Sequence, residues 1–480
     1  MQLGELVQAA GLDELGLLSR IVGDVTVDVS SVVIDSRRSG VASMFACIPG
    51  NVVDGHSFAP EAVANGSTSL LCERELDLEV PQVVVASVRR ALGPISDVVW
   101  DRPSAGLRVV GVTGTNGKTT TAAMLRAIFD ANGWKAMAIG TLTQTRTTPE
   151  APELQALLAD WRGTGGQAVA MEVSSHALDQ HRCDAIRFAA GLFLNLTPEH
   201  LDYHGDMESY FQAKVRLFEP GRIGVAVVNS DDPWGQRLAE MLSEGSTPVV
   251  TFSTGQISGL EMTPAGSSFL WRGQKVKLSL GGHFNVSNAL GAATCAEALE
   301  VPADVVAQGL SDLEGVPGRF ETVDAGQPFS VIVDYAHTPD GLASVLGAAR
   351  QICDGRLIVV FGAGGERDRS KRPMMGSVAS RLADLLIVTS DNPRSEDPDA
   401  IVAEILQGVS DSEASALSQL DRAEAIATSL ATAQAGDVVV IAGKGHEKYQ
   451  EVGGKLIPFD DVAVVKEALT RIHSTRRAGL

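Results

Sequence analysis

The sequence is poor in basic residues, with 39 Lys and Arg against 59 Asp and Glu and a formal net charge of −20. A groove for nucleic acid needs clustered Lys and Arg to contact phosphates, so this balance argues against a nucleic-acid partner. One local cationic pocket would still suffice for a phosphorylated small molecule. The excess of negative charge is otherwise explained by solubility.

Cysteine is scarce and long apolar runs are lacking. The five cysteines are far apart and form no Cys-x-x-Cys pair, which is typical of a reducing cytosol with neither disulfides nor a zinc site. No basic N-terminal stretch leads into a long apolar run, and no stretch of about 18 apolar residues occurs. We therefore expect a cytoplasmic protein without a signal peptide or membrane span. At 480 residues, it should contain two to four domains.

A glycine-rich stretch over residues 111–120 organises the chain. It reads Gly-Val-Thr-Gly-Thr-Asn-Gly-Lys-Thr-Thr, between an apolar run at 107–110 and a helical pattern at 121–128. Strand, glycine loop and helix together are the context of a phosphate-binding loop, although the glycine spacing is the Gly-x-x-Gly-x-x-Gly-Lys-Thr variant. Lys118 adds a positive charge, and the hydroxyl of Thr119 can bind Mg²⁺. The predicted phosphate-binding residues are Gly114, Thr115, Asn116, Gly117, Lys118, Thr119 and Thr120.

Polar residues follow the other strands predicted in the middle of the chain. Glu172 ends a strand at 167–171, where it could hold Mg²⁺ or cap a helix. Thr147 and Thr148 could be helix caps or substrate contacts. His200 reads by itself as an ordinary loop residue, and Lys214 as a solvated lysine on a helix over 208–217. Asn288, near the start of a helix at 283–296, could cap it or bind a base through its amide.

The two ends of the chain also alternate strand and helix. Near the N-terminus, Asp35-Ser36-Arg37 follows an apolar run at 32–34, and Arg37 could bind an anion or lie solvated on the surface. In the last third, strands predicted at 330–334, 357–361, 385–389 and 438–442 indicate a Rossmann-like domain. Arg367, Arg394 and Glu447 follow such strands and could meet over one polar substrate or be surface charges.

Five motifs, in order along nearly the whole chain, resemble those of the Mur ligase family. They are the phosphate loop, Met-Glu-Val-Ser-Ser-His at 171–176, Asn-Leu-Thr at 195–197 with His-Leu-Asp-Tyr-His-Gly at 200–205, Asp-Tyr-Ala-His at 334–337, and Gly-Lys-Gly-His-Glu at 443–447. Within the family, the chain is most similar to the UDP-N-acetylmuramoyl-tripeptide synthetases.

The resemblance implies an α/β fold of three domains. These are a small mixed α/β module over 1–100 that binds the UDP-sugar, a central P-loop ATPase-type domain over 101–317 with a mostly parallel sheet, and a Rossmann-like domain over 318–480 that brings the amino acid. It implies that ATP phosphorylates the γ-carboxylate of D-glutamate in UDP-N-acetylmuramoyl-L-alanyl-D-glutamate. The amine of a diamino acid then displaces the phosphate, and the expected enzyme is a monomer.

The resemblance also assigns roles to residues. Thr119 and Glu172 would hold one Mg²⁺, and Glu172, His200 and a carbamylated Lys214, modified by CO₂, would hold or orient a second; this reverses the solvated interpretation of Lys214. Lys118, Glu172, His200 and Lys214 would be the catalytic set. The further ATP-binding positions are Asn288, Arg319 and Asp334. The sugar-nucleotide positions are Asp35, Ser36, Arg37, Thr147, Thr148, Ser174, Gln180 and Arg182, although the loop over 142–147 is shorter than in many relatives.

The predicted amino-acid site selects a diamino acid. Asp-Asn-Pro-Arg at 391–394 resembles the version that selects meso-diaminopimelate, whose second amino-carboxylate end would suit a bidentate Arg394. The expected contacts with this substrate are Arg367, Asp391, Asn392, Pro393, Arg394, Gly443 and Glu447. The alternatives are a ligase for L-lysine, another Mur-type or folylpolyglutamate-type ligase, or, in a different class, a nucleotide-binding regulatory protein without chemistry.

Overall fold

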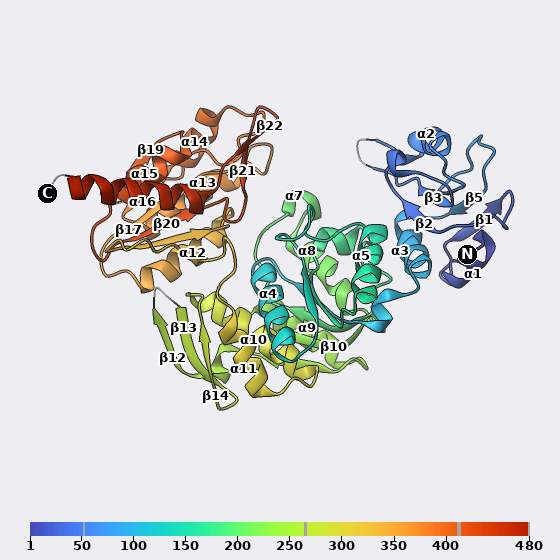
Figure 1. The fold of residues 1–480 in the computed structure, drawn as a ribbon, viewed down its shortest axis with the longest axis horizontal. Helices are drawn as coiled ribbons and strands as arrows, with labels where there is room; N and C mark the ends of the chain where they lie inside the picture. Colours follow the sequence, from blue (N-terminus) through green and yellow to red (C-terminus); the bar gives the residue numbers. More distant parts are fainter. Residues whose placement is uncertain (51–52, 264–265, 410–413, 479–480) are drawn as a thin grey trace.

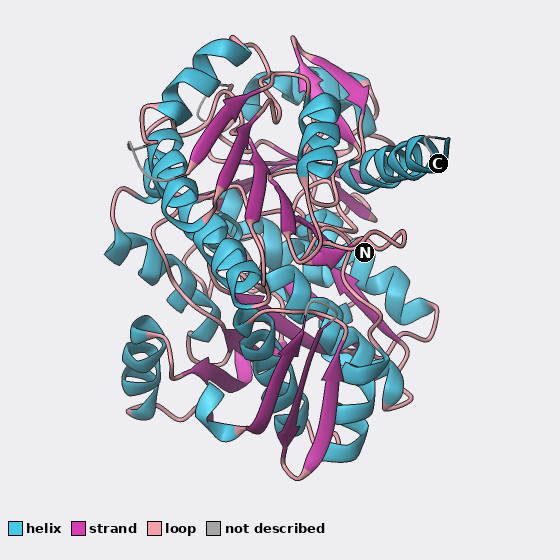
Figure 2. Ribbon diagram, turned by 90° about the vertical axis from the view of Figure 1, so that its left-hand side faces the viewer, coloured by secondary structure: helices cyan, strands magenta, loops and turns pink. Residues whose placement is uncertain are grey.

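The computed structural model describes residues 1–50, 53–263, 266–409 and 414–478, and it forms three bodies, each built around a sheet. Figure 1 shows them in chain order, with the N-terminal body at one side, the central body in the middle and the C-terminal body at the other side. Figure 2 shows helices and strands throughout the molecule. The predicted α/β class, with mostly parallel sheets in the central and C-terminal parts, is confirmed.

The N-terminal body has a five-stranded mixed sheet in the order β1-β5-β4-β3-β2, in which only the β1–β5 pair is antiparallel. Its strands are β1 (Leu18–Val22), β2 (Ser31–Val33), β3 (Ser43–Ala46), β4 (Ser69–Cys72) and β5 (Gln82–Val85). Its helices are α1 (Leu3–Ala9), α2 (Ala59–Ala64) and α3 (Val88–Val99). The strands β3, β4 and β5 are buried on both faces, and for this reason their sequences are almost continuously apolar.

The central body has a six-stranded parallel sheet in the order β11-β10-β9-β6-β8-β7. Its strands are β6 (Arg108–Thr113), β7 (Ala136–Ile139), β8 (Ala168–Glu172), β9 (Phe188–Phe193), β10 (Ile223–Asn229) and β11 (Val249–Phe252). A small antiparallel sheet of β12 (Ser258–Thr263), β13 (Gly266–Trp271) and β14 (Gln274–Leu278) follows. In a parallel sheet the carboxyl ends of all strands lie at one edge, which gathers the polar residues that follow β6, β8 and β9.

Helices cover both faces of the central sheet. One core joins the sheet to α4 (Lys118–Ala131), α10 (His283–Ala298) and α11 (Ala303–Asp312). The remaining helices of this body are α5 (Ala151–Gly163), α6 (Ser175–Asp179), α7 (Leu201–His204), α8 (Met207–Val215) and α9 (Pro233–Ser243). A second core joins the other face of the sheet to α5, α6, α8 and α9.

The C-terminal body has a six-stranded sheet in the order β15-β16-β20-β17-β18-β19, parallel except at the short β15 edge. Its strands are β15 (Glu321–Thr322), β16 (Ser330–Asp334), β17 (Leu357–Phe361), β18 (Leu385–Val388), β19 (Ser415–Ser418) and β20 (Val438–Ala442), with a hairpin of β21 (Tyr449–Val452) and β22 (Lys455–Pro458). Its helices are α12 (Pro339–Gln351), α13 (Lys371–Leu382), α14 (Pro398–Leu406), α15 (Arg422–Thr432) and α16 (Asp461–Ala478). Among the described residues, none of the helices has both the length and the apolar character needed to cross a bilayer.

One local prediction in the central body is wrong, and one of two alternatives is excluded. The sequence Ala-Met-Ala-Ile-Gly-Thr-Leu at 136–142 predicts one strand, but β7 ends at Ile139 and the chain turns at Gly140. A Cβ at Gly140 would lie 2.0 Å from the Glu172 Oε1 atom, so glycine permits this close approach. Thr147 and Thr148 do not cap the next helix, because α5 begins at Ala151 and its N-cap is Glu150.

The connection between the N-terminal and central bodies carries a buried carboxyl group. Asp97 lies on α3, and its Oδ1 atom is buried with no hydrogen-bond partner among the residues that the structure describes, while its Oδ2 atom lies 3.9 Å from Arg102 Nε. Asp101 and Arg102 both adopt left-handed backbone conformations, with φ of 56° and 46°. Arg162 of α5 fixes the turn by donating to the Asp101 carbonyl at 2.9 Å. The connection is therefore held from both bodies, and Asp97 is poorly compensated within it.

The buried Asp97 carboxylate, when ionised, should lower the free energy of unfolding at neutral and alkaline pH. Burial raises its pKa from 3.8 to about 6, with Arg102, Arg187 and the side chain of Gln155 opposing the shift. Between these two pKa values the folded state binds more protons than the unfolded state, so the free energy of unfolding falls as pH rises. The full loss of stability is reached above the folded-state pKa of about 6. We expect Asp97→Asn to raise Tm by ~2 °C at pH 8 and by less at pH 4.

Differential scanning calorimetry of both proteins at both pH values measures this effect. Asp130→Asn is the matched control, because Asp130 lies on the half-exposed surface of α4, 3.6 Å from Arg126. An Asp97→Asn protein with the same shift at both pH values, or with a lower Tm at pH 8, would contradict the prediction.

Candidate active site

The glycine loop joins β6 to the N-terminus of α4, as the sequence predicts. Gly117 is the N-cap of α4 with φ of 88°, a conformation that favours glycine. The segment after β9 fixes the loop: Asn195 Oδ1 accepts from the Asn116 backbone N–H at 2.9 Å, and the Thr115 hydroxyl accepts from the Thr197 N–H at 3.0 Å. The free N–H groups at the start of α4 therefore sit in a rigid loop suited to phosphate.

Two lysine amines meet at one carbonyl of this loop. Lys118 Nζ donates to the Gly114 carbonyl at 2.8 Å, and Lys214 Nζ donates to the same oxygen at 2.9 Å. The Lys214 side chain is 1% exposed, so its interpretation as a solvated helix lysine is wrong. Burial, together with the nearby charge of Lys118, lowers the pKa of Lys214 well below its usual value. A buried amine with a lowered pKa is readily unprotonated and hence nucleophilic.

Glu172 lies at the end of β8, beside the glycine loop's strand. Its side chain is buried and accepts from the Thr141 backbone N–H at 2.8 Å. The alternative role as a helix cap is wrong, because α6 is capped by Ser174, which accepts from the Ala177 N–H at 3.2 Å. The carboxylate is therefore held at the carboxyl edge of the sheet by the turn that follows β7.

His200 precedes α7 in a left-handed conformation with φ of 58°. Its ring lies edge-on to that of His176, with centroids 4.7 Å apart, and 6.1 Å from the ring of Tyr210, whose ring also faces the amine of Lys214 at 4.6 Å. Burial lowers the pKa of His200 to about 4, so the imidazole is neutral at pH 7. A neutral imidazole has the lone pair that a metal ligand requires.

Glu199 is an acidic residue near this centre that the sequence analysis does not single out. Its two carboxylate oxygens lie 3.9 Å from His200 Nε2 and 3.9 Å from His337 Nε2, respectively. His337 belongs to the C-terminal body, in the segment between β16 and α12. The sequence around Glu199, between Pro198 and His200, does not indicate this role. The contact with His337 forms only because the central and C-terminal bodies come together.

Other polar contacts also join the glycine loop to the C-terminal body. Arg319 Nη2 donates to the Thr119 hydroxyl at 3.1 Å, and its guanidinium lies 4.4 Å from the ring centroid of Tyr335. Asp340, at the start of α12, accepts from Asn116 Nδ2 at 3.0 Å and from the Thr197 hydroxyl at 2.9 Å. These hydrogen bonds form a polar seam between the two bodies.

The remaining predicted nucleotide residues surround the same seam. The Asp334 carboxylate accepts from the N–H groups of Phe320 at 2.7 Å and Ala336 at 2.8 Å, and burial raises its pKa. Asn288 does not cap α10, whose N-cap is Gly282. A Cβ at Gly117 would lie 2.2 Å from Asn288 Oδ1, so the amide packs directly against the loop. Thr120 is buried on α4.

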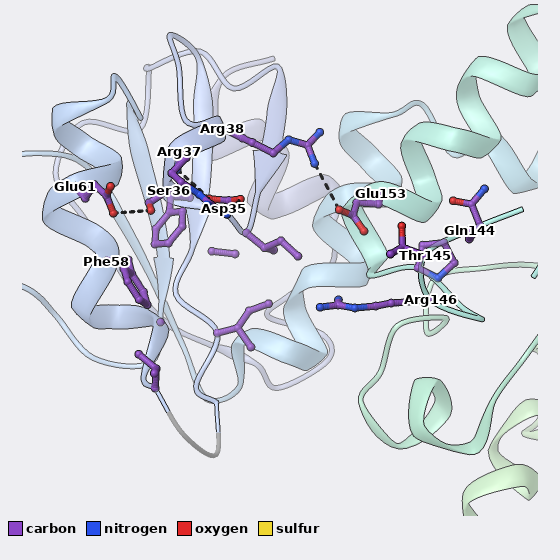
Figure 3. A pocket seen from close by; sticks show the side chains of 17 residues that line it. Asp35, Ser36, Arg37, Arg38, Phe58, Glu61, Gln144, Thr145, Arg146 and Glu153 are labelled. Atoms are coloured by element: carbon purple, nitrogen blue, oxygen red, sulfur yellow. Dashed lines mark hydrogen bonds and ion pairs between the residues drawn. The ribbon is translucent and has the colours of Figure 1, made fainter. Parts of the chain in front are cut away.

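A pocket of about 770 Å³ lies between the N-terminal body and the loop that precedes α5 (Figure 3). Ser36, Arg37 and Arg38 contribute from one side, and Gln144, Thr145 and Arg146 from the other. Ser36 donates to Glu61 at 2.7 Å, whereas Arg37 is 81% exposed and pairs with Asp35 at 2.8 Å. Arg146 points from its loop into the space between the two sides. Residues 144–146 give no signal in the sequence, because a short irregular loop has no periodic pattern.

The other predicted sugar-nucleotide residues form a hydrogen-bonded group near the end of β8. Thr148 donates to the Glu172 carbonyl at 2.9 Å and accepts from the Ser174 N–H at 3.2 Å. Arg182 donates to the Thr148 carbonyl at 2.9 Å and to Gln180 Oε1 at 2.6 Å. The Thr147 and Thr141 hydroxyls are 3.3 Å apart. This group therefore connects the pocket to the Glu172 carboxylate.

A further polar group gathers at the carboxyl ends of β18 and β20. Arg394 donates to the Gly365 carbonyl at 2.6 Å and pairs with Glu451 at 3.0 Å. Asn392 donates to Glu447 at 2.9 Å. Arg367 is exposed, and a Cβ at Gly364 would lie 3.2 Å from Arg394 Nη1 and 3.7 Å from Arg367 Cγ.

Gly443 provides the close approach between the two strand ends. It has φ of 118°, and a Cβ there would lie 2.3 Å from Asp391 Oδ2. Pro393 is buried between Asn392 and Arg394. The predicted residues at 391–394, 443 and 447 thus lie together, with Arg367 at the rim.

The donor set at the glycine loop fits a magnesium nucleotide. Arg319 Nε is buried with no hydrogen-bond partner among the described residues, an orphaned donor that a phosphate oxygen would satisfy. Hydroxyl and carboxylate oxygens are suitable ligands for Mg²⁺, and a neutral imidazole can accept a hydrogen bond from a water bound to the ion. Within the described ranges, no three His, Cys, Asp or Glu side chains cluster as a metal site. The predicted metal site includes Thr119 and Lys214 in addition to Glu172 and His200, so only two of its four residues are of those types.

Comparisons with known proteins match the chain over all three bodies. The family model described as "Mur ligase family, catalytic domain" matches residues 28–98, the "Mur ligase middle domain" residues 112–296, and the "Mur ligase, glutamate ligase domain" residues 318–445. A relative from Geobacillus kaustophilus is 44% identical over 92% of this chain and 95% of its own, and one from Streptomyces coelicolor is 41% identical over 96% and 95%. Both are named UDP-N-acetylmuramoyl-L-alanyl-D-glutamate--2,6-diaminopimelate ligase.

A solved structure of a protein of that name has the same fold. It aligns with a TM-score of 0.70 at 33% identity, covering 98% of this chain and 99% of its own. The similarity thus extends over the three bodies.

Proposed function

We propose, since the chain belongs to the Mur ligase family, that it joins meso-diaminopimelate to the D-glutamate γ-carboxylate of UDP-N-acetylmuramoyl-L-alanyl-D-glutamate. The reaction is an ATP-dependent, ADP-forming ligation in peptidoglycan precursor synthesis. The observation that carries the proposal is the 44% identity over 92% of the chain to a relative named for this reaction.

The chemistry follows from the poor electrophilicity of a carboxylate. Its oxygen attacks the γ-phosphorus of ATP, which forms an acyl phosphate and releases ADP. The diamino-acid amine then attacks the acyl carbon, loses a proton and expels phosphate as the amide forms. Lys118 and the N–H groups of α4 stabilise charge on the transferring phosphoryl group, while Arg319 and Asn288 orient the nucleotide.

The metal and carbamate assignments belong to this proposal. Thr119 and Glu172 would hold one Mg²⁺, and Glu172, His200 and carbamylated Lys214 a second; bound ions supply charge neutralisation on the phosphates. The lowered pKa of Lys214 supports the modification, because its unprotonated amine can attack CO₂ to give an N-carboxylate and a proton. The sugar nucleotide would lie along the pocket and the adjoining hydrogen-bonded group. The residues that would bind it there are Ser36, Thr147, Thr148, Ser174, Gln180 and Arg182.

The organisation of the chain supports a monomeric, cytoplasmic enzyme. All the proposed sites are formed within one chain, so we propose that one copy is sufficient for catalysis. The five cysteines are free thiols and four are buried, which is consistent with a reducing compartment. We propose that the three bodies act as the domains expected over 1–100, 101–317 and 318–480.

A phosphate-release assay with purified protein, ATP, Mg²⁺ and the UDP-dipeptide tests the function. Phosphate release is expected with meso-diaminopimelate, and mass spectrometry should detect the UDP-tripeptide. Release with L-lysine but not with meso-diaminopimelate would overturn the substrate, and failure to form ADP with any diamino acid would overturn the ligase proposal.

Arg394→Ala should raise the apparent KM for meso-diaminopimelate about tenfold, because a charge-assisted pair to a substrate carboxylate is lost. The KM for ATP should change little. Arg394→Lys retains the charge without the planar fork, so its KM should lie between those of the wild type and Arg394→Ala. Steady-state kinetics with the amino acid varied measures the effect, and an unchanged KM in Arg394→Ala would contradict the contact.

A further inference from the structure

A buried lysine lies beneath the polar group at 391–394 and 447 and is absent from the predicted site residues. Lys444 follows β20, and its side chain is 0% exposed. Its Nζ atom donates to Asn392 Oδ1 at 3.0 Å and to Glu447 Oε2 at 3.0 Å. A fully buried ammonium that reaches two groups of one ligand site requires an explanation, since burying a charge is costly unless it is paired.

The hydrogen bonds fix the orientation of the Asn392 amide. Its Oδ1 atom accepts from Lys444 Nζ and also from the Glu451 backbone N–H at 3.0 Å. Both partners are obligate donors, so a flipped amide would present its NH₂ group to two donors. The Asn392 NH₂ group must therefore face Glu447, where it donates to Oε2 at 2.9 Å.

The same lysine fixes the Glu447 carboxylate. Oε2 accepts from both Lys444 and Asn392, while Oε1 has no hydrogen bond to any residue that the structure describes. The Glu447 side chain is 20% exposed, so the carboxylate lies at the edge of the buried group. One oxygen is thus held inside, and the other remains available to a cationic ligand.

Lys444 also stabilises the segment that carries Arg394. The Glu451 N–H that shares Asn392 Oδ1 belongs to β21, and Glu451 pairs with Arg394 at 3.0 Å. Gln450 of the same strand donates to the Asp391 carbonyl at 2.8 Å. Loss of Lys444 would leave Asn392 free to rotate at the centre of these contacts.

We infer that Lys444 is a positioning residue for amino-acid recognition: it locks Asn392 and Glu447 so that Glu447 Oε1 receives a substrate ammonium group. The inference rests on the proposed function, because it places an amino group of the diamino acid at this oxygen. Lys444 does not itself touch the substrate. It acts with Asn392 and Glu447 as one unit.

Kinetics of Lys444→Met tests the inference. Methionine is close in length and apolar, so it removes the charge with little change in volume. The apparent KM for meso-diaminopimelate should rise about 10- to 100-fold, the equivalent of a lost hydrogen bond to a charged group. The KM values for ATP and the UDP-dipeptide should stay within about twofold.

Lys448→Met is the matched control. Lys448 lies four residues further along, is 63% exposed and pairs with Asp460 at 2.6 Å. The control should behave as wild type. Thermal unfolding of all variants shows whether they are folded; if Lys444→Met is not, Lys444→Leu, which also removes both hydrogen bonds, replaces it under the same criterion.

A double-mutant cycle with Glu447→Gln separates positioning from general stability. If the two residues act as one unit, Lys444→Met/Glu447→Gln should have nearly the KM of Glu447→Gln alone. Fully additive effects, or an equal rise in the KM values for all three substrates, would overturn the inference. Wild-type ligation of meso-diaminopimelate is measured first; its absence would refute the proposed function, whereas wild-type activity with an unaffected Lys444→Met variant would refute only the role of Lys444.

Discussion

Lys214→Ala should lower kcat about 10³-fold while leaving the protein folded, because it removes a charged group from a preorganised phosphoryl-transfer site. Lys214 is buried under the glycine loop, and its amine shares the Gly114 carbonyl with Lys118. If the amine is carbamylated, the variant loses an anionic ligand. Added formate or acetate should then partly restore turnover by entering the vacated space.

The carbamate also has a readout that does not depend on turnover. Wild-type protein equilibrated with ¹³C-labelled bicarbonate should give a carbamate carbonyl signal in its ¹³C NMR spectrum, and Lys214→Ala should not. Lys135→Ala is a control from the exposed surface of the same body, where Lys135 Nζ donates to the Thr164 carbonyl. Full activity in Lys214→Ala would refute the catalytic role, and a labelled signal that persists in this variant would refute the site of modification.

Gly117→Ala should lower kcat/KM for ATP by about 100-fold, the scale expected when a misplaced group disturbs a preorganised site. Gly117 has φ of 88°, which alone costs an alanine roughly 1 kcal/mol. In addition, the new Cβ would lie 2.2 Å from Asn288 Oδ1. Asn288 must then turn away, and the loop loses both its geometry and the amide that we propose contacts the nucleotide.

Gly133→Ala separates these two effects. Gly133 follows the other end of α4 with φ of 75°, but a Cβ there would meet nothing within 4 Å. Both variants should therefore lose similar backbone stability, whereas the loss of ATP affinity should be confined to Gly117→Ala. Isothermal titration with a non-hydrolysable ATP analogue measures the affinity. Equal affinities in the two variants would contradict the clash.

Much of the central body could be predicted because its signals are local. The glycine loop lies between an apolar strand and a helical pattern, and Glu172 follows a strand parallel to the first. The carboxyl ends of parallel strands meet at one edge, so sequence order alone brings Glu172 and Lys118 to the same region. The C-terminal group at 391–394 and 443–447 follows from the same rule.

Several of the failures involve contacts between distant segments. The burial of Lys214 depends on a carbonyl 100 residues earlier, and a helix lysine has no local feature that reveals it. Thr147 and Thr148 resemble helix caps in sequence, yet Thr148 instead bonds the backbone around the end of β8. Lys444 lies within a motif that is visible in the sequence, but its role depends on Asn392 in another strand connection.

Because we propose that the glycine loop binds ATP, the polar seam around Asp340 would link nucleotide recognition to the relative orientation of two bodies. Asp340 belongs to α12, yet it holds Asn116 of the glycine loop and Thr197 behind it. Nucleotide binding and the relative orientation of the two bodies are then thermodynamically coupled: if binding favours one orientation, a substitution that favours the same orientation raises nucleotide affinity. Substitutions far from the phosphates, along the first turn of α12, should consequently register in a nucleotide titration.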